Sequence, residues 1–143
     1  VAEKLLDNTF IPACSPLLAL HDASELPRHP LIHFRSSSAG SGPVDWAGWQ
    51  KLARVPGLDV SAGLVFSDET HAVSAAVGAQ GVALMSRELI EDELAAGRLV
   101  QPFGPEIKGK AFYLVYPESR KHDPIIQAVR DWVMAVPGGV CTL

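Results

Sequence analysis

The segment from Val65 to Leu84 constrains the fold of this chain most, because its pattern changes from strand to helix and back within a short stretch. The apolar run Leu64 to Phe66 predicts a strand. Ser67 and Asp68 have short oxygen side chains that suit a helix N-cap, and Glu69 favours a first turn through the helix dipole. We therefore expect a helix to begin near Glu69.

The second half of this segment predicts a close return to the same sheet. The residues from Ala72 to Val77 are small, so this helix can lie close against a sheet, and Gly78 and Gly81 are suited to the chain reversal. Val82 to Leu84 is short and apolar, as buried parallel strands are. Ligands of open α/β sheets bind outside the carboxyl ends of the strands, so the turn after Phe66 is predicted to contact a ligand.

The rest of the chain alternates strand and helix patterns in the same way, which favours an α/β fold with a mostly parallel sheet. Ser86 is expected to cap a helix running from Arg87 to Ala96, and Asp123 and Pro124 are suited to begin a final helix that ends near Ala135. Arg35 to Pro43 and Val136 to Leu143 have the composition of irregular segments. The other predicted strands are Phe10 to Ala13, Leu31 to Phe34, Arg98 to Pro102 and Phe112 to Tyr116, and the other predicted helices are Leu17 to Leu20 and Asp45 to Arg54.

Two of these helices have an apolar face that we expect to be buried. Trp46, Trp49 and Leu52 recur at helical spacing, and we interpret the tryptophans as core residues rather than ligand-stacking ones. The final helix has a longer stripe, made of Ile125, Ile126, Val129, Trp132 and Val133.

Composition excludes several classes of protein. The chain has 143 residues, 48% of them hydrophobic, which is enough to bury a core, and its net charge of -4 includes no basic cluster of the kind that binds nucleic acid. No apolar run approaches the length of a membrane span, and no secretory leader is recognisable. We therefore expect a cytoplasmic protein in which Cys14 and Cys141 are reduced thiols.

We find no pattern typical of an enzyme, a metal centre or a cofactor site. The histidines are scattered, and Glu91, Asp92 and Glu93 point in different directions around a helix. The pair Gly78 and Gly81 closes a helix, whereas phosphate-binding glycine motifs open one. We predict no catalytic residues, no metal and no cofactor.

Two strand-to-helix turns remain as candidate binding sites, at Ala13 to Pro16 and at Phe66 to Glu69. Each would present free backbone N–H groups and hydroxyls at a helix N-terminus, which suits a polar ligand group. Simple helix capping explains both turns equally well. Cys14, near a predicted helix start, could alternatively act as a redox-active thiolate.

A family resemblance favours the ligand-binding interpretation. The segments FIPACSP, HPLIHF, DWAGW, GLVFSDET, GAQGVAL, LAAGRLVQPF and FYLVYP occur in this order. Together they resemble the effector-binding domain of LysR-type transcriptional regulators, most closely the subgroup that regulates glycine cleavage and β-lactamase genes. The resemblance extends from about Leu5 to Ala135.

The resemblance implies a type 2 periplasmic-binding-protein-like α/β fold, in which two subdomains are joined by two crossing strands. Residues 1–13 would be the hinge strand from the first subdomain, and 14–98 the complete second subdomain. Residues 99–136 would be the return hinge strand with the C-terminal strand and helix of the first subdomain, followed by an irregular tail at 137–143. The opening half of the first subdomain and the DNA-binding domain would lie in a longer parent protein.

The resemblance also implies which residues bind the effector in the cleft and which residues form the hinge. The implied effector-binding residues are Cys14, Ser15, Pro16, Phe66, Ser67, Asp68, Thr70 and Phe112. The implied hinge residues are Thr9, Phe10, Ile11, Val100, Gln101 and Pro102.

The function implied by the resemblance is regulation of transcription without enzymatic activity. A small-molecule effector would bind between the subdomains and change the conformation of a homodimer or homotetramer of the parent protein, which would bind DNA through an N-terminal helix-turn-helix domain. The helix from Glu69 to Val77 could also contribute to oligomerisation. Two alternatives stay open: a stand-alone solute-binding or interaction module of the same fold, and a thiol redox sensor that uses Cys14.

Overall fold

A computed structural model of the chain describes residues 1–35 and 44–136. Most of the predicted loop at Arg35 to Pro43, nearly all of the tail and Cys141 lie outside the described residues. The described chain divides into two compact units, one made of Thr9–Gly109 and the other of Val1–Asn8 with Lys110–Leu143. The boundaries at 8/9 and 109/110 differ from the boundaries at 13/14 and 98/99 that the sequence suggested, because residues 99–109 pack with the larger unit.

The larger unit contains a five-stranded sheet with the strand order β4-β3-β5-β2-β6. Strands β3 and β5 are parallel, as are β3 and β4, whereas β2 runs antiparallel to both β5 and β6. The sheet is therefore mixed, and the prediction of a mostly parallel sheet was wrong. The strands are β2 (Thr9–Ala13), β3 (Leu31–Phe34), β4 (Leu64–Phe66), β5 (Val82–Ser86) and β6 (Ile107–Lys108).

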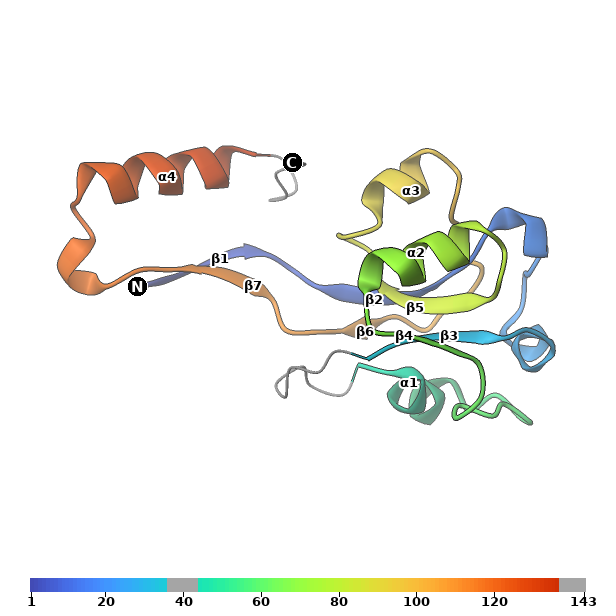
Figure 1. Ribbon diagram of the computed structural model, residues 1–143. Coiled ribbons are helices and arrows are strands. Elements are labelled where there is room, and N and C mark those ends of the chain that lie inside the picture. Colours follow the sequence, from blue (N-terminus) through green and yellow to red (C-terminus); the bar gives the residue numbers. More distant parts are fainter. Residues whose placement is uncertain (36–43, 137–143) are drawn as a thin grey trace. The chain divides into compact units, whose positions relative to one another are not determined.

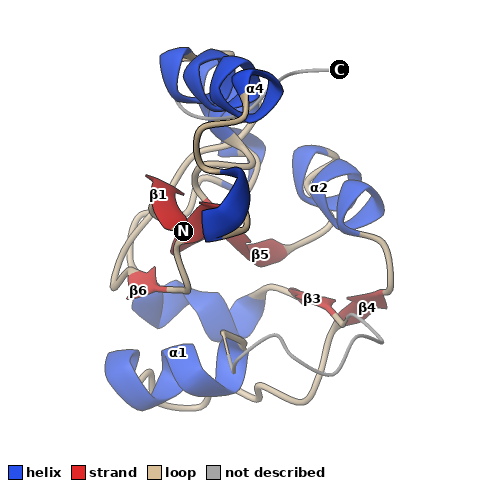
Figure 2. Ribbon diagram, turned by 90° about the vertical axis from the view of Figure 1, so that its left-hand side faces the viewer, coloured by secondary structure: helices blue, strands red, loops and turns tan. Residues whose placement is uncertain are grey.

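Helices cover both faces of this sheet (Figures 1 and 2). Strand residues alternate between the two faces: Ile32 and Ala83 pack with the alanines of α2, whereas Leu31 and Val82 pack with Trp46 and Trp49 of α1. This alternation follows from the two-residue period of a strand. The helices of this unit are α1 (Trp46–Ala53), α2 (Glu69–Val77) and α3 (Glu91–Ala95), with 3-10 helices η1 (Pro16–Leu18) and η2 (Ala23–Arg28).

Helix α2 begins and ends for the reasons that the sequence suggested, with one exception. The Asp68 side chain accepts a hydrogen bond of 3.2 Å from the backbone N–H of His71, which makes Asp68 the N-cap. After the helix, the left-handed position is taken by Ala79 with φ 59°, and Gly78 has an ordinary negative φ. Gly81 serves another purpose, because a Cβ atom there would lie 2.4 Å from the carbonyl oxygen of Pro30.

The prediction that Trp46 and Trp49 are core residues is confirmed. Trp46 and Trp49 are fully buried and meet edge to face with ring centroids 5.2 Å apart, but Leu52 is exposed.

Ser86 is the last residue of β5 and caps no helix, so α3 is much shorter than the predicted helix. Gly97, with φ 73°, follows it in the left-handed conformation.

The predicted strand Arg98 to Pro102 is reduced to a single bridge between Val100 and Cys14. Pro102 has no N–H to continue a ladder, and the chain leaves the edge of β2 until β6 pairs with Thr9 and Phe10. Strand β6 (Ile107–Lys108) was not among the predicted strands.

The smaller unit consists of a two-stranded antiparallel sheet, β1 (Ala2–Leu6) with β7 (Phe112–Val115), the 3-10 helix η3 (Glu118–Arg120) and α4 (Pro124–Ala135). Asp123 caps α4 through a 2.9 Å hydrogen bond from the N–H of Ile125, and Pro124 occupies the first turn, as predicted. Glu3 joins the elements: its carboxylate accepts hydrogen bonds from the Tyr116 hydroxyl at 2.7 Å and from Arg130 Nε at 2.7 and 2.9 Å.

The apolar stripe of α4 is not buried. Ile125 is 70% exposed and Trp132 is 56% exposed, and no residue of this helix is buried. Tyr113 and Val115 of β7 are also exposed. The prediction that the stripe buries one side of the helix is therefore wrong for the described residues, because a two-stranded sheet is too small to cover it.

We expect Gly81→Ala to destabilise the larger unit by about 1 to 3 kcal/mol, because the added methyl group would collide with the Pro30 carbonyl and push the start of β5 away from the segment that precedes β3. Chemical denaturation followed by Trp46 and Trp49 fluorescence measures this change. Gly104→Ala is the control, since a Cβ there meets no atom closer than 4.0 Å. Equal stability of the two variants would contradict the close contact at Gly81.

We expect the stability of the smaller unit to fall in acid in a manner that depends on Glu3. Hydrogen bonds from Arg130 and Tyr116 hold the pKa of Glu3 below its ordinary value. The ionised carboxylate therefore contributes its stabilisation above the ordinary carboxylate pKa, and the contribution is lost as the pH falls through the lowered folded-state pKa.

Amide exchange in β1 and β7, followed as a function of pH, measures this effect, and Glu3→Gln should remove it. Glu118→Gln is the control, since the Glu118 side chain makes an exposed ion pair of 3.5 Å with Lys121. An acid response that persists in Glu3→Gln would show that another group controls it.

Candidate functional site

The carboxyl ends of β3, β4 and β5 lie along one edge of the larger unit's sheet, because these strands are parallel. Strand β2 begins at the same edge, since Phe10 pairs with Ser86 at the end of β5. Four chain segments therefore meet there. Open α/β sheets bind their ligands at such an edge.

A cavity of about 610 Å³ opens at this edge. This volume lies within the range of small-molecule sites, which is roughly 300 to 1,000 Å³. The lining combines aromatic surface with groups of both charges, and it comes from β2, β3, β5 and the starts of α1 and α2. The described lining residues are Phe10, Ile32, His33, Phe34, Arg35, Val44, Asp45, Trp46, Ala47, Val60, Ser61, Glu69, Leu84 and Met85.

Hydrogen bonds to the backbone hold the polar walls of the cavity. The buried His33 ring makes a 2.8 Å hydrogen bond between Nε2 and the carbonyl oxygen of Ala62. Trp46 donates its Nε1–H to the carbonyl oxygen of Ile32 at 3.0 Å. Both rings are thereby fixed in orientation beside the cavity.

Glu69 is the acidic group that lines the cavity at the start of α2. Burial, with the Asp68 carboxylate adding repulsion, raises the pKa of Glu69 above its ordinary value. Within the part of the chain that the structure describes, the Glu69 side chain makes no hydrogen bond or ion pair, which leaves the carboxylate able to accept a hydrogen bond from a ligand. Arg35 supplies a positive charge to the same lining.

The predicted residues of the second turn lie at this edge. Phe66 ends β4, and Ser67, Asp68 and Thr70 surround the start of α2. The Asp68 carboxylate is engaged in capping. Of this turn, Glu69 is the residue that lines the cavity. The sequence interpretation had placed Glu69 in a candidate binding turn but not among the implied effector-binding residues.

Cys14, Ser15 and Pro16 lie at the opposite end of the sheet. Strand β2 is antiparallel to its neighbours, so its carboxyl end, where Ala13 pairs with Ala83, lies near the amino ends of β3 and β5. Cys14 and Phe66 are offset by three residues along the strand direction, which is about 10 Å. They are also three strands apart across the sheet, which is about 14 Å. The structure therefore does not bring the two predicted turns together.

The first turn is occupied by contacts within the protein. Cys14 and Ser15 are buried, Cys14 exchanges backbone hydrogen bonds of 2.8 and 3.1 Å with Val100, and Ser15 Oγ accepts one of 3.2 Å from the N–H of Leu17. Burial raises the pKa of the Cys14 thiol to about 11. At neutral pH this thiol is protonated.

The remaining predicted positions are divided between the two units. Phe112 is a half-exposed residue of β7 in the smaller unit. Thr9, Phe10 and Ile11 belong to β2, which begins directly after the boundary between the units. Val100, Gln101 and Pro102 lie within the larger unit, well before the boundary at Gly109.

Sequence reasoning missed Phe10, Phe34 and Arg35 as cavity-lining residues. Phe34 and Arg35 stand where the predicted strand Leu31 to Phe34 ends, which was a usable signal. Phe10 could be recognised only from the direction of β2, which local sequence does not reveal.

The described residues contain no group of three or more His, Cys, Asp or Glu side chains placed to hold a metal ion. Within the described ranges, no helix has both the length and the apolar character needed to cross a membrane.

Comparison with known proteins identifies relatives among transcriptional regulators. The glycine cleavage system transcriptional activator of Escherichia coli K12 is 34% identical over 139 residues, which is 93% of this chain and 44% of that protein. The HTH-type transcriptional activator AmpR of Rhodobacter capsulatus is 31% identical over 134 residues, with 92% and 44% covered. The chain thus spans less than half the length of these relatives.

Solved structures of effector domains share the fold. The effector domain of AmpR from Pseudomonas aeruginosa matches with a TM-score of 0.69 and 27% identity, covering 93% of this chain and 63% of that one. The AmpR effector-binding domain from Citrobacter freundii matches with a TM-score of 0.73 and 23% identity, covering 94% and 66%. These matches confirm the predicted periplasmic-binding-protein-like α/β class.

The family model described as the LysR substrate binding domain matches residues 1–137. Together with the mixed sheet and the cavity at its edge, this match shows that the chain belongs to the LysR substrate-binding domain family.

Proposed function

We propose that the chain is the effector-sensing part of a LysR-type transcriptional regulator, and that a small molecule binds at the carboxyl edge of the sheet in the larger unit. The cavity of about 610 Å³ is the observation that carries this proposal. Its mixture of aromatic surface with Glu69 and Arg35 suits a small polar effector that has apolar parts. Regulators of transcription among the relatives support a role without catalysis.

In this proposal Thr9–Gly109 is the complete second subdomain, and the smaller unit is part of the first. A two-stranded sheet is marginal on its own, and the exposed Ile125 and Trp132 require a cover. The effector domains of the relatives are about half as long again as this chain, since it covers 63% to 66% of them. The rest of the first subdomain, in a longer parent protein, would cover this apolar face and contribute the other wall of the effector site.

Effector binding would act by population shift. A ligand that contacts both subdomains stabilises one hinge state over another by its differential affinity for the two states. In the parent protein this change would be transmitted, through a homodimer or homotetramer in the cytoplasm, to DNA-binding domains. Relatives named as HTH-type regulators support this arrangement.

Substitution of the cavity lining tests the proposed site. Phe34→Ala removes a half-exposed ring from the cavity without opening a core, so we expect reduced effector binding in the parent protein with little loss of stability. Glycine is the first probe, since one relative is named for glycine cleavage, followed by other amino acids and sugars. Calorimetric titration measures the binding.

Ser15→Ala is the matched control, because Ser15 lies at the opposite end of the sheet and caps η1. We expect it to bind the effector normally, at a cost of about 1 kcal/mol in stability. Normal binding by Phe34→Ala together with weak binding by Ser15→Ala would move the site to the first turn.

The buried Cys14 argues against the alternative of a thiol redox sensor. Redox-sensing cysteines are exposed thiolates, whereas burial raises the pKa of Cys14 to about 11.

We expect Cys14 to react slowly with Ellman's reagent at pH 7 in the folded protein and rapidly after denaturation, because the reactive thiolate is scarce and shielded. A Cys141→Ser background isolates the signal, since Cys141 lies outside the described residues. Rapid reaction of folded Cys14 at pH 7, or its oxidation by dilute peroxide, would instead support a thiol redox sensor.

A further inference from the structure

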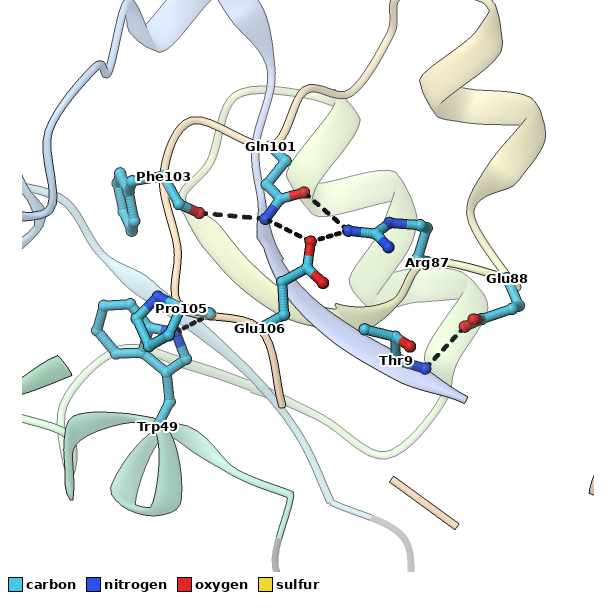
Figure 3. Close-up of polar contacts among 8 residues, drawn as sticks. All are labelled: Thr9, Trp49, Arg87, Glu88, Gln101, Phe103, Pro105 and Glu106. Atoms are coloured by element: carbon cyan, nitrogen blue, oxygen red, sulfur yellow. Dashed lines mark hydrogen bonds and ion pairs between the residues drawn. The ribbon is translucent and has the colours of Figure 1, made fainter. Parts of the chain in front are cut away.

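Two residues that follow β5 bind both segments through which the chain leaves the larger unit. The chain passes between the units at Asn8/Thr9 and again at Gly109/Lys110. Thr9 is the first residue after one boundary, and Glu106 lies shortly before the other. Arg87 and Glu88 contact both of them (Figure 3).

The contacts with Thr9 use both of its backbone groups. The Glu88 carboxylate accepts a hydrogen bond of 2.9 Å from the Thr9 N–H, and the Arg87 N–H donates one of 2.8 Å to the Thr9 carbonyl oxygen. The buried Ser86 hydroxyl donates to the same Glu88 oxygen at 3.2 Å, which orients the carboxylate. Hydrogen bonds to a charged acceptor are stronger than neutral ones.

The second crossing segment, which contains Glu106, is held by the Arg87 side chain and by Trp49. The Arg87 guanidinium is ion-paired with Glu106 and donates to Gln101 Oε1 at 3.2 Å, while Gln101 Nε2 lies 3.4 Å from the same Glu106 carboxylate. The Arg87 and Glu106 side chains are 40% and 44% exposed, so solvent weakens this pair. A firmer support is the hydrogen bond of 2.9 Å that Trp49 Nε1–H donates to the carbonyl oxygen of Pro105.

We propose that Arg87 and Glu88 form a clamp that restrains movement between the two units by holding both crossing segments on the end of β5. The β2–β6 pairing of Thr9 with Lys108 and of Phe10 with Ile107 is short, at two residue pairs. The Glu88–Thr9 and Arg87–Glu106 contacts add to this pairing, at the start of β2 and directly before β6. Glu88 is the main positioning residue, because its contact with Thr9 is the less exposed one.

Nitrogen-15 relaxation of the 143-residue chain tests the clamp, because it reports separate rotational correlation times for the two units. In Glu88→Ala we expect the correlation time of the smaller unit to fall relative to that of the larger one. The Thr9 amide should also exchange about tenfold faster, through the loss of one charge-assisted hydrogen bond. Amides of Ile32 and Ala83 in the core should keep their exchange rates.

Glu88→Gln is the rescue variant, since its amide oxygen can still accept from the Thr9 N–H. Arg98→Met is the matched control, because it removes the Arg98–Glu93 ion pair of the same unit away from both crossing segments. Unchanged correlation times in Glu88→Ala, or an equal change in Arg98→Met, would overturn the proposal. If Glu88→Ala does not fold, Arg87→Met takes its place. Unchanged correlation times in Arg87→Met, or an equal change in Arg98→Met, would then overturn the proposal.

Discussion

The antiparallel direction of β2 is the constraint on which the candidate site depends. Strand β2 pairs with β5 in the middle of the sheet, whereas β3, β4 and β5 all run the other way. The start of β2 therefore lies beside the carboxyl ends of three parallel strands, and the carboxyl end of β2 lies at the opposite edge of the sheet. This single reversal places Phe10 in the cavity and Cys14 in the core.

Local patterns predicted the elements of the larger unit well where the signal was short-range. Asp68 caps α2, the two tryptophans of α1 pack in the core, and β3 occupies the predicted residues. These features depend on the chemistry of neighbouring residues. Strand direction depends on pairing between segments distant in sequence, so the mixed sheet and the separation of the two turns could not be read from the same patterns.

The failures at Ser86 and at Arg98 to Pro102 have the same origin. Ser86 could cap a helix by its chemistry, but its hydroxyl contacts Glu88, which in turn binds Thr9. Val100 is suited to a strand, but Cys14 offers it only one bridge before the chain departs. In each case a contact with β2 or its flanking residues decided between two locally acceptable structures.

The way Glu3 is bound has a consequence for the order of folding. Its partners Tyr116 and Arg130 are separated from it by 113 and 127 positions in the chain. Within this chain β1 is synthesised before β7, and the residues of the larger unit lie between the two strands. The larger unit can thus fold first and bring the ends of the smaller one together, which lowers the entropic cost of closing so long a loop.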